Sequence, residues 1–251
     1  MKRIHYTDNY LLSPTHPVTV NLIGCGGTGS QVYTSLARIN QALIALGHPG
    51  LYVFSFDADM ISESNIARQL FSPSDIGLNK AEVLTTRLNR FFGTDWHAYN
   101  YMYDESSNAA NIIISCVDNI KSRLEIAKLN TEECHPLYNP IYWLDFGNGR
   151  STGQFVLGSF NKVNQPSVKN TETVSKLKLV TELFDYSKVN EEDSGPSCSL
   201  AAALSKQDLF INSSLSMLGC NLLWRLFSVG STDCQGGYLN LETMRVNPIR
   251  I

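Results

Sequence analysis

The sequence VTVNLIGCGGTGS, residues 18–30, decides the fold of this chain. Its first six residues are mostly apolar, which is typical of a strand buried on both faces of a parallel sheet. Apolar residues at helical spacing follow, from residue 28 to about residue 46. Between strand and helix, the glycines predict a tight turn whose backbone N–H groups approach a phosphate at the start of the helix. The turn alone is a weak signal, because a strand-to-helix connection without a ligand uses the same residue types. Its glycines are Gly24, Gly26, Gly27 and Gly29.

A second apolar run, LYVFSF at residues 51–56, ends at the acids Asp57 and Asp59. In a doubly wound sheet, the carboxylate after the second strand lies beside the ribose of a nucleotide that occupies the glycine turn. The position therefore predicts that Asp57 binds a ribose, with capping of a turn as the alternative. For Asp59 two interpretations stay open: an acid that shapes the turn, or a polar neighbour of the phosphates.

The segment between this strand and the next helix carries two cations, Arg68 in SNIARQ and Lys80 in DIGLNK. When a reaction at one phosphate of a nucleotide expels the phosphates beyond it, negative charge grows on the leaving oxygens. Fixed cations stabilise that charge: arginine offers several planar donors, and lysine offers a point charge. Asn65 and Gln69 are predicted to add amide donors at the same site. The alternative for the whole segment is a solvated polar loop.

Asp118 follows the apolar run IIISC at residues 112–116. Ligands of open α/β sheets collect at the carboxyl ends of the strands, and a carboxylate there can hold Mg²⁺ between phosphates. The sequence thus predicts Asp118 as a metal ligand. Capping of the helix expected at about residues 121–130 is a second role for the same side chain, and the two roles are compatible.

These motifs occur in the order GxGGxGS, DxD, SNxxRQ and DxGxxK, and in this order they resemble the ThiF family. That family includes the ATP-dependent activators of ubiquitin and of bacterial sulfur-carrier proteins. Within the family, the chain is similar in sequence to the ThiF-like branch encoded in bacterial PRTRC gene clusters. The stretches that carry this similarity are HPGLYVFSFDAD, RQLFSPSDIGLNKAEVL and RLNRFFGTDW. The resemblance covers nearly the whole chain and is weakest over residues 161–195.

The resemblance implies ATP and Mg²⁺ as cofactors, Asp57 as the ribose ligand and Asp118, in a D-N-x-x-x-R context, as the magnesium ligand. The implied reaction is adenylation of the C-terminal carboxylate of a small ubiquitin-like or sulfur-carrier-like protein. Cys198, in GPSCSLAAAL, lies where relatives place a cysteine that bonds to the carrier. Transfer to Cys198 is one interpretation. An inert thiol at a loop–helix junction is the other, because some relatives adenylate without the matching cysteine.

The implied partners are the small carrier protein and a JAB-type metalloprotease homologue from the same gene cluster. ThiF relatives commonly form two-fold dimers, and in some of them the neighbour's N-terminal arginine reaches the ATP phosphates. Arg3 is the only arginine before Arg38, which makes it the one candidate for that role. The resemblance therefore implies a homodimer.

Two rival functions stay open. An NAD-dependent oxidoreductase shares the glycine turn and Asp57, but this function gives no reason for Arg68 and Lys80. A nucleotide-binding scaffold that has lost catalysis would keep the same nucleotide-binding residues, and all of them are present here.

The composition bounds the class of protein. With 251 residues, 43% of them apolar and 17% charged, the chain is long enough for one large α/β domain. A net charge of −3 argues against a general nucleic-acid surface. No apolar run reaches the ~18 residues of a membrane span, and MKRIHYTDNY lacks the apolar core of a signal peptide. Together these features predict a cytoplasmic protein without a membrane or nucleic-acid partner.

The six cysteines include no C-x-x-C pair, so no structural zinc site is expected, although many ThiF relatives carry two such pairs.

We expect an α/β fold with a Rossmann-like sheet that is parallel in its N-terminal half and antiparallel in its C-terminal half. The antiparallel part is predicted by strands at residues 142–146 and 154–157, because the glycines between them are typical of a hairpin. Residues 161–195 lose periodicity and hold few large apolar groups outside a patch at residues 177–184, which predicts a mobile, crossover-type insertion within a single domain of residues 1–251. A long apolar helix is expected at about residues 205–227.

Overall fold

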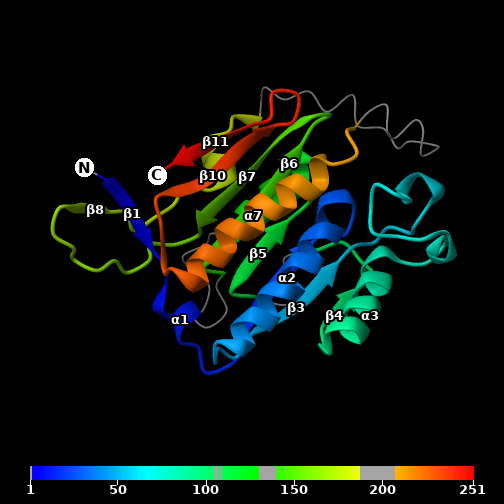
Figure 1. Ribbon diagram of the computed structural model, residues 1–251, viewed down its shortest axis with the longest axis horizontal. Helices are drawn as coiled ribbons and strands as arrows, with labels where there is room; N and C mark the ends of the chain where they lie inside the picture. Colours follow the sequence, from blue (N-terminus) through cyan, green and yellow to red (C-terminus); the bar gives the residue numbers. More distant parts are fainter. Residues whose placement is uncertain (1, 105–106, 108, 130–139, 187–206) are drawn as a thin grey trace.

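The computed structural model describes residues 2–104, 107, 109–129, 140–186 and 207–251. Its centre is an eight-stranded sheet with helices on both faces (Figure 1). The strands of this sheet, in chain order, are β2 (Val18–Ile23), β3 (Leu51–Phe56), β4 (His97–Tyr99), β5 (Ile112–Ser115), β6 (Tyr142–Asn148), β7 (Thr152–Ser159), β10 (Cys234–Asn240) and β11 (Arg245–Arg250).

The strand order across the sheet is β11-β10-β7-β6-β5-β2-β3-β4. β2 pairs in parallel with β3 and β5, and β5 pairs in parallel with β6. The hairpin of β6 and β7 reverses the direction, and β10 and β11 continue the antiparallel part. The expected fold class is confirmed. Because β2, β3 and β5 are parallel neighbours, the loops that follow them lie together at one edge of the sheet.

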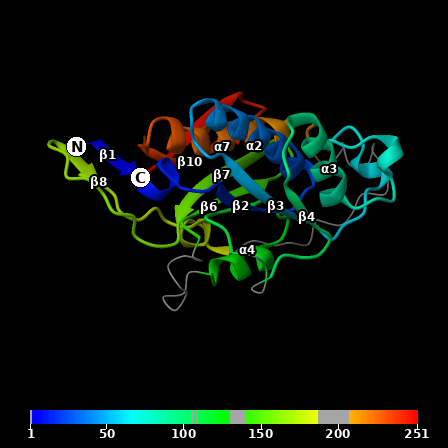
Figure 2. The ribbon, with the colours of Figure 1, turned by 90° about the horizontal axis from the view of Figure 1, so that it is seen from below.

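Two layers of helices cover the sheet (Figure 2). One face carries α2 (Gly27–Ala45), α3 (Lys80–Phe92) and α7 (Ile211–Ser228), and the other carries α4 (Ile120–Ala127) and α5 (Val180–Leu183). Of these helices, α7 lies beside α2 and against β6 and β7. Gly219 permits this approach, since a Cβ atom there would overlap the ring of Phe146. The long apolar helix expected from the sequence is therefore present, and it packs as a core helix.

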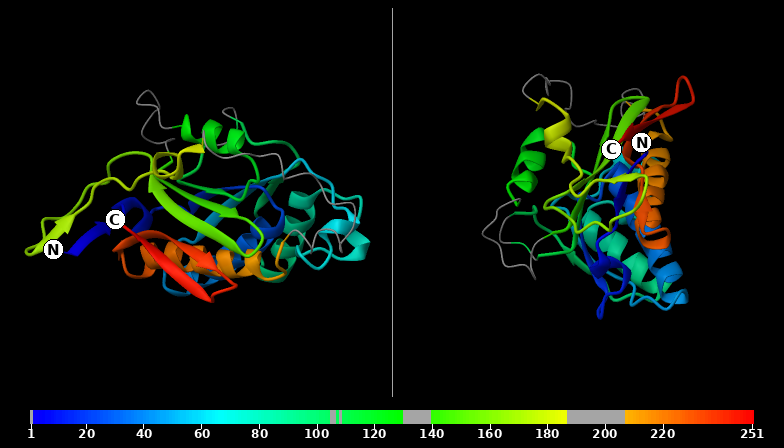
Figure 3. Two further views of the ribbon diagram at one scale, coloured as in Figure 1. Left: turned by 90° about the horizontal axis from the view of Figure 1, so that it is seen from above. Right: turned by 90° about the vertical axis from the view of Figure 1, so that its left-hand side faces the viewer.

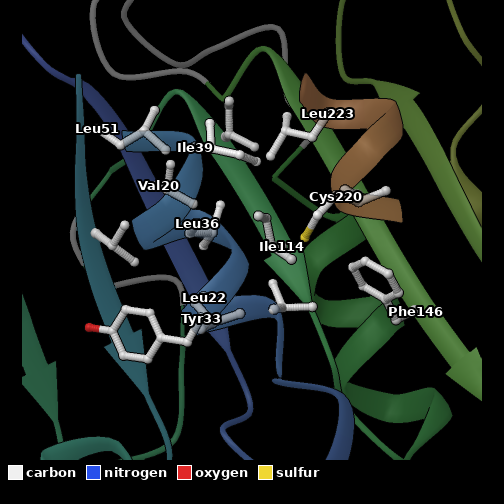
Figure 4. Close-up of a cluster of buried hydrophobic side chains, with 14 of the residues drawn as sticks. Val20, Leu22, Tyr33, Leu36, Ile39, Leu51, Ile114, Phe146, Cys220 and Leu223 are labelled. Carbon is white, nitrogen blue, oxygen red and sulfur yellow. The ribbon is translucent and has the colours of Figure 1, made fainter. Parts of the chain in front are cut away.

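The largest group of buried side chains lies between the sheet and the layer of α2 and α7 (Figure 4). Val20 and Leu22 of β2 pack with Leu36 of α2, and none of the three is exposed to solvent. Burial of one such side chain stabilises the folded state by about 1.5–3 kcal/mol. This packing fixes β2 and α2 relative to each other, and so it holds the glycine turn that joins them.

A second, smaller sheet projects from the body of the molecule (Figure 3). In it, β1 (Lys2–Tyr6) lies between β8 (Thr171–Thr173) and β9 (Ser231–Thr232). Arg3 belongs to β1 and donates a hydrogen bond from Nε to Glu172 Oε1 at 3.1 Å. In Figure 1 this sheet lies at the opposite end of the molecule from the glycine turn, so Arg3 does not reach the site of its own chain.

The described part of residues 161–195 differs from the expectation. Val163, Leu177 and Leu179 are buried, and the backbone N–H of Leu177 donates to Ser159 Oγ of β7 at 2.9 Å. Leu177 and Leu179 belong to the apolar patch at residues 177–184, whereas Val163 is buried outside it, where little apolar burial was expected. Isolated apolar side chains along an irregular chain fill spaces against the sheet, and such packing leaves no periodic signal. Residues 187–195 lie outside the described residues, and the mobile insertion within a single domain stays a prediction.

Three short elements complete the described chain. α1 (Asn9–Leu12) precedes β2, and the 3-10 turns η1 (Glu63–Asn65) and η2 (Pro73–Asp75) lie between β3 and α3. Across the described ranges, no helix combines the length and the apolar character that a membrane crossing requires.

Candidate functional site

The four glycines of the turn differ in how much space surrounds them. Gly24 has φ +87°, a left-handed conformation that favours glycine, and a Cβ atom on it would lie 2.8 Å from the carbonyl oxygen of Cys116. A Cβ atom on Gly29 would overlap Gly24 O, and one on Gly27 would meet the amide of Asn212 at 2.5 Å. These three glycines are thus required by packing.

Gly26 differs, because among the described residues a Cβ atom there would meet only Gln69 Nε2, at 4.0 Å. The space over Gly26 is open at the start of α2, where unpaired backbone N–H groups and the positive end of the helix dipole attract an anion. The contact of Gly24 with Cys116 also places this turn directly against the loop after β5.

Asp57 ties the end of β3 to the glycine turn. Its Oδ2 accepts a hydrogen bond from Cys25 N at 2.6 Å, and its Oδ1 accepts one from Asp59 N at 2.8 Å. Burial raises the pKa of the Asp57 carboxyl above its usual value, while the nearby Lys80 ammonium and the two N–H donors act in the opposite direction. The capping role expected as the alternative is therefore present, and each oxygen keeps a second lone pair for a ribose hydroxyl.

Lys80 and Asp59 form an ion pair that the sequence did not reveal. Lys80 Nζ lies 2.7 Å from Asp59 Oδ2; the lysine side chain is 10% exposed and the aspartate 70% exposed. Asn79 places Lys80 as the first residue of α3, since Asn79 caps the helix by accepting from Glu82 N and donates to Asp57 O. The positive charge of Lys80 thus lies at the positive end of the α3 dipole. This arrangement destabilises the helix and attracts an anion.

Arg68 is held by Gln207, in the segment that leads into α7. Its Nη1 donates to Gln207 Oε1 at 2.7 Å, and Asn212 Nδ2 donates to the same oxygen at 3.1 Å. Asn212 Oδ1 in turn accepts from Thr28 Oγ1 in the glycine turn at 2.9 Å. This chain of contacts connects Arg68 with the turn, although the residues are far apart in the sequence.

Two buried polar atoms of this region have no hydrogen-bond partner among the described residues, Arg68 Nε and Gln69 Oε1. Next to them, Ala67 has φ +65°, a conformation that is strained for a residue with a side chain. Unsatisfied buried polar atoms and local strain are uncommon in folded proteins and gather at functional sites. These features favour a binding segment over the solvated polar loop that the sequence left as the alternative.

Asn65 has a structural contact as well. Its Oδ1 accepts hydrogen bonds from Ser62 N at 2.9 Å and from Ser62 Oγ at 3.2 Å, and so it caps η1. Among the described residues, Asn65 Nδ2 donates to no partner, which leaves it as the donor that the sequence predicts.

Asp118 lies on the loop between β5 and α4 and is exposed. The helix cap is Asn119, whose Oδ1 accepts from Ser122 N at 2.8 Å, so the capping role expected for Asp118 is wrong. Among the described residues, Asp118 Oδ1 accepts from Asn119 Nδ2 alone, at 3.2 Å, and the side chain is exposed. The described residues contain no cluster of three or more metal-ligand side chains. Mg²⁺ is commonly held by one carboxylate together with phosphates and water, which fits Asp118.

The sequence reasoning missed Arg123 and Asp145, a buried pair beneath the Asp118 loop with Nε to Oδ1 at 3.0 Å. The only signal was the arginine of the D-N-x-x-x-R spacing. Cys198 lies outside the described residues. Two other thiols are buried, and burial raises the pKa of Cys25 well above its usual value and that of Cys220 to about 12, which makes both unreactive.

Known proteins resemble this chain in sequence and in fold. The sequence model of the ThiF family matches residues 15–157, more than half of the chain. Ubiquitin-like modifier-activating enzyme 5 of Drosophila persimilis is 28% identical over 147 residues, which cover 51% of this chain and 34% of the relative. The chain thus spans about a third of the length of this relative.

Solved structures share the fold at lower identity. E. coli MccB in crystals with selenomethionine-labelled MccA has a TM-score of 0.62 and 16% identity, with 96% of this chain and 65% of that chain covered. The same protein with ATP has a TM-score of 0.59 and 15% identity, with 96% and 64% covered.

Proposed function

The chain belongs to the ThiF family, and from this premise we propose that it uses ATP to adenylate the C-terminal carboxylate of a small ubiquitin-like or sulfur-carrier-like protein. The observation that carries the proposal is the pair of cations beside an open glycine turn. Lys80 lies at the positive end of α3, and Arg68 keeps a buried N–H that has no partner in the described part of the chain. The rival function, an NAD-dependent oxidoreductase, gives no reason for either cation.

In this proposal the phosphates of ATP lie over Gly26 at the start of α2, and Asp57 binds the ribose. Arg68 and Lys80 face the β- and γ-phosphates, with amide donors from Asn65 and Gln69 beside them. The name of the relative supports the substrate class, and MccB, whose structure was determined with ATP, has the same fold.

The chemistry needs little acid–base help from the protein. A C-terminal carboxyl has an ordinary pKa of about 3.3–3.7 and is ionised at neutral pH. Its oxygen forms a bond to the α-phosphorus, and the bond from that phosphorus to the bridging oxygen breaks. Pyrophosphate leaves with the electron pair. The work of the site is therefore to position the two reactants and to stabilise charge on the leaving group.

Asp118 is the residue that would hold Mg²⁺ beside the phosphates. A bound Mg²⁺ would neutralise part of the negative charge of the phosphates. The protein side of this arrangement is one exposed carboxylate on a loop that packs against the glycine turn through Cys116 and Gly24.

Further parts of the proposal concern partners. We place the chain in the PRTRC branch, with a JAB-type metalloprotease homologue as a second partner, in the cytoplasm and as a homodimer. Arg3 lies in the small sheet away from its own site, so it serves only the nucleotide of a neighbouring copy. Transfer of the activated carboxylate to Cys198 is the proposed second step. Cys198→Ser is expected to leave adenylation intact and to abolish any thioester with the carrier.

The test is ATP–pyrophosphate exchange in the presence of candidate carrier proteins. Exchange that requires both the carrier and its free C-terminal carboxylate supports the proposal. Binding of NAD that equals or exceeds binding of ATP in calorimetry would favour the oxidoreductase. Binding of ATP without exchange by any carrier would favour a scaffold that has lost catalysis.

A further inference from the structure

A buried ion pair lies beneath the loop that carries Asp118. Arg123 is 7% exposed and Asp145 is fully buried. Arg123 Nε donates to both carboxylate oxygens of Asp145, at 3.0 and 3.1 Å. Asp145 also accepts from Ser115 Oγ at 2.5 Å, and Trp143 Nε1 donates to that Oγ at 2.6 Å. The carboxylate is thus fixed by neighbours from β5 and β6, and it cannot meet a substrate.

The free end of the guanidinium holds the Asp118 loop. Arg123 Nη2 donates to Val117 O at 2.8 Å and to Phe146 O, also at 2.8 Å. Its Nη1 lies 3.5 Å from Asn119 O, at the limit of a hydrogen bond. Val117 and Asn119 are the residues before and after Asp118, so one side chain reaches the backbone on both sides of that carboxylate and joins it to the end of β6.

Stability alone does not account for this arrangement. Removal of two charges from water costs several kcal/mol per ion, and replacement of a buried ion pair by apolar side chains is often neutral or stabilising. An apolar pair, however, cannot donate hydrogen bonds to the carbonyls of a loop. Arginine is suited to that task, because its planar fork offers five N–H donors in a fixed geometry.

We propose that Arg123, anchored by Asp145, is a positioning residue that sets the Asp118 carboxylate in place for a divalent cation. The inference rests on the proposed function of Asp118 as the ligand of the cation that accompanies ATP. Partners that orient a metal ligand typically contribute about 10–100-fold to metal affinity. Arg123 acts through the backbone of the ligand and touches neither the cation nor the nucleotide.

The test separates the metal-dependent part of nucleotide binding from the rest. Calorimetry measures the affinity of the full chain for a non-hydrolysable ATP analogue, once with Mn²⁺ and once with EDTA. The ratio of the two affinities is the gain from the cation. We expect Arg123→Met/Asp145→Leu, which removes both buried charges, to keep the EDTA affinity and to reduce the gain by about tenfold or more. Arg123→Lys keeps a charge for Asp145, but its donors all lie on one nitrogen and lack the planar spread with which arginine reaches Asp145 and the loop carbonyls together. This variant is expected to reduce the gain as well.

Asp118→Asn is the reference, because it removes the ligand itself and should abolish the gain. Thermal unfolding shows whether each variant is folded, and Arg123→Lys gives the answer if the double variant is not. A folded double variant with the wild-type gain would overturn the inference and leave the role of Asp118 intact. A full gain in Asp118→Asn would overturn the role of Asp118 and the inference with it. A wild-type protein that does not bind the analogue would overturn the proposed function first.

Discussion

Lys80 Nζ lies 2.7 Å from Asp59 Oδ2, so the ammonium at the start of α3 is paired with an acid before any phosphate arrives. The lysine is nearly buried and the aspartate points to solvent. An incoming anion must compete with Asp59 for the same donor. This relationship predicts an effect of Asp59 on nucleotide binding, where the sequence left open a turn acid and a neighbour of the phosphates.

Asp59→Asn is therefore expected to strengthen ATP binding. An ion pair with one exposed partner contributes up to about 1 kcal/mol, which corresponds to about a fivefold decrease in Kd. Calorimetry at low salt measures the change. Glu63→Gln is the matched control, because it removes one exposed negative charge from η1 without contact to Lys80. Weaker binding by Asp59→Asn would show that the aspartate itself contributes to the nucleotide site.

Arg68→Ala is expected to lower the rate of ATP–pyrophosphate exchange by about 10²-fold or more, as loss of a donor aimed at developing charge does. Lys80→Ala should have an effect of the same order. Arg90→Ala is the control, since Arg90 is an exposed arginine of α3 outside the site. Circular dichroism should show folded protein in all three variants. Wild-type exchange by Arg68→Ala would remove this arginine from the catalytic assignment.

The glycines separate binding from folding. Gly26→Ala places a methyl group over the open start of α2, where only Gln69 Nε2 lies within 4.0 Å, so the protein should fold and lose affinity for ATP. Gly29→Ala drives a Cβ atom into Gly24 O, and such overpacking costs about 1–3 kcal/mol or more. Urea denaturation and calorimetry on both variants measure the two effects. Equal loss of stability in both variants would contradict the different roles given to these glycines.

Asp57 predicts a pH dependence of stability. Its folded-state pKa is raised, mainly by burial, so the folded chain holds the proton more tightly than the unfolded chain does. The contribution of Asp57 to the free energy of unfolding is therefore fully present below its ordinary pKa of about 3.9 and is lost as pH rises through the raised value.

Asp57→Asn isolates this contribution, because asparagine has no proton to lose there and its oxygen still accepts from Cys25 N. Urea denaturation of both proteins between about pH 3 and about pH 7 gives the difference in free energy of unfolding. The wild type should lose stability relative to the variant as pH rises through the window. A difference that grows in the opposite direction would mean that Lys80 and the N–H donors outweigh burial.

The sequence predicted β2, β3 and β5 well, because each of these strands is an apolar run of four to six residues. It gave no sign of β1, whose buried residue is His5, held by Val174 O at 2.7 Å and by Tyr142 OH at 2.8 Å. A buried histidine looks polar in a sequence. β11 was missed for a related reason: it is exposed along nearly its whole length and shows no alternation.

The site was predicted as a set of residues, not as a set of contacts. The order of acids and cations in the sequence identified Asp57, Arg68, Lys80 and Asp118. The sequence gave no sign of contacts between residues that are far apart in the chain, such as Arg68 and Gln207, which are 139 positions apart. The cap assigned to Asp118 was wrong because Asn119 is as good a capping residue and stands one position closer to the helix.

The outer strand β11 limits how this protein can associate with other chains. Pro248 has no backbone N–H to offer, and an arginine stands at each end of the strand, Arg245 and Arg250. Proline and charged side chains on an edge strand block growth of a sheet by addition of another strand. Fibril-like stacking from this edge is disfavoured even at high protein concentration. A dimer that pairs main chains along β11 is therefore disfavoured, and we expect any dimer to use a different surface.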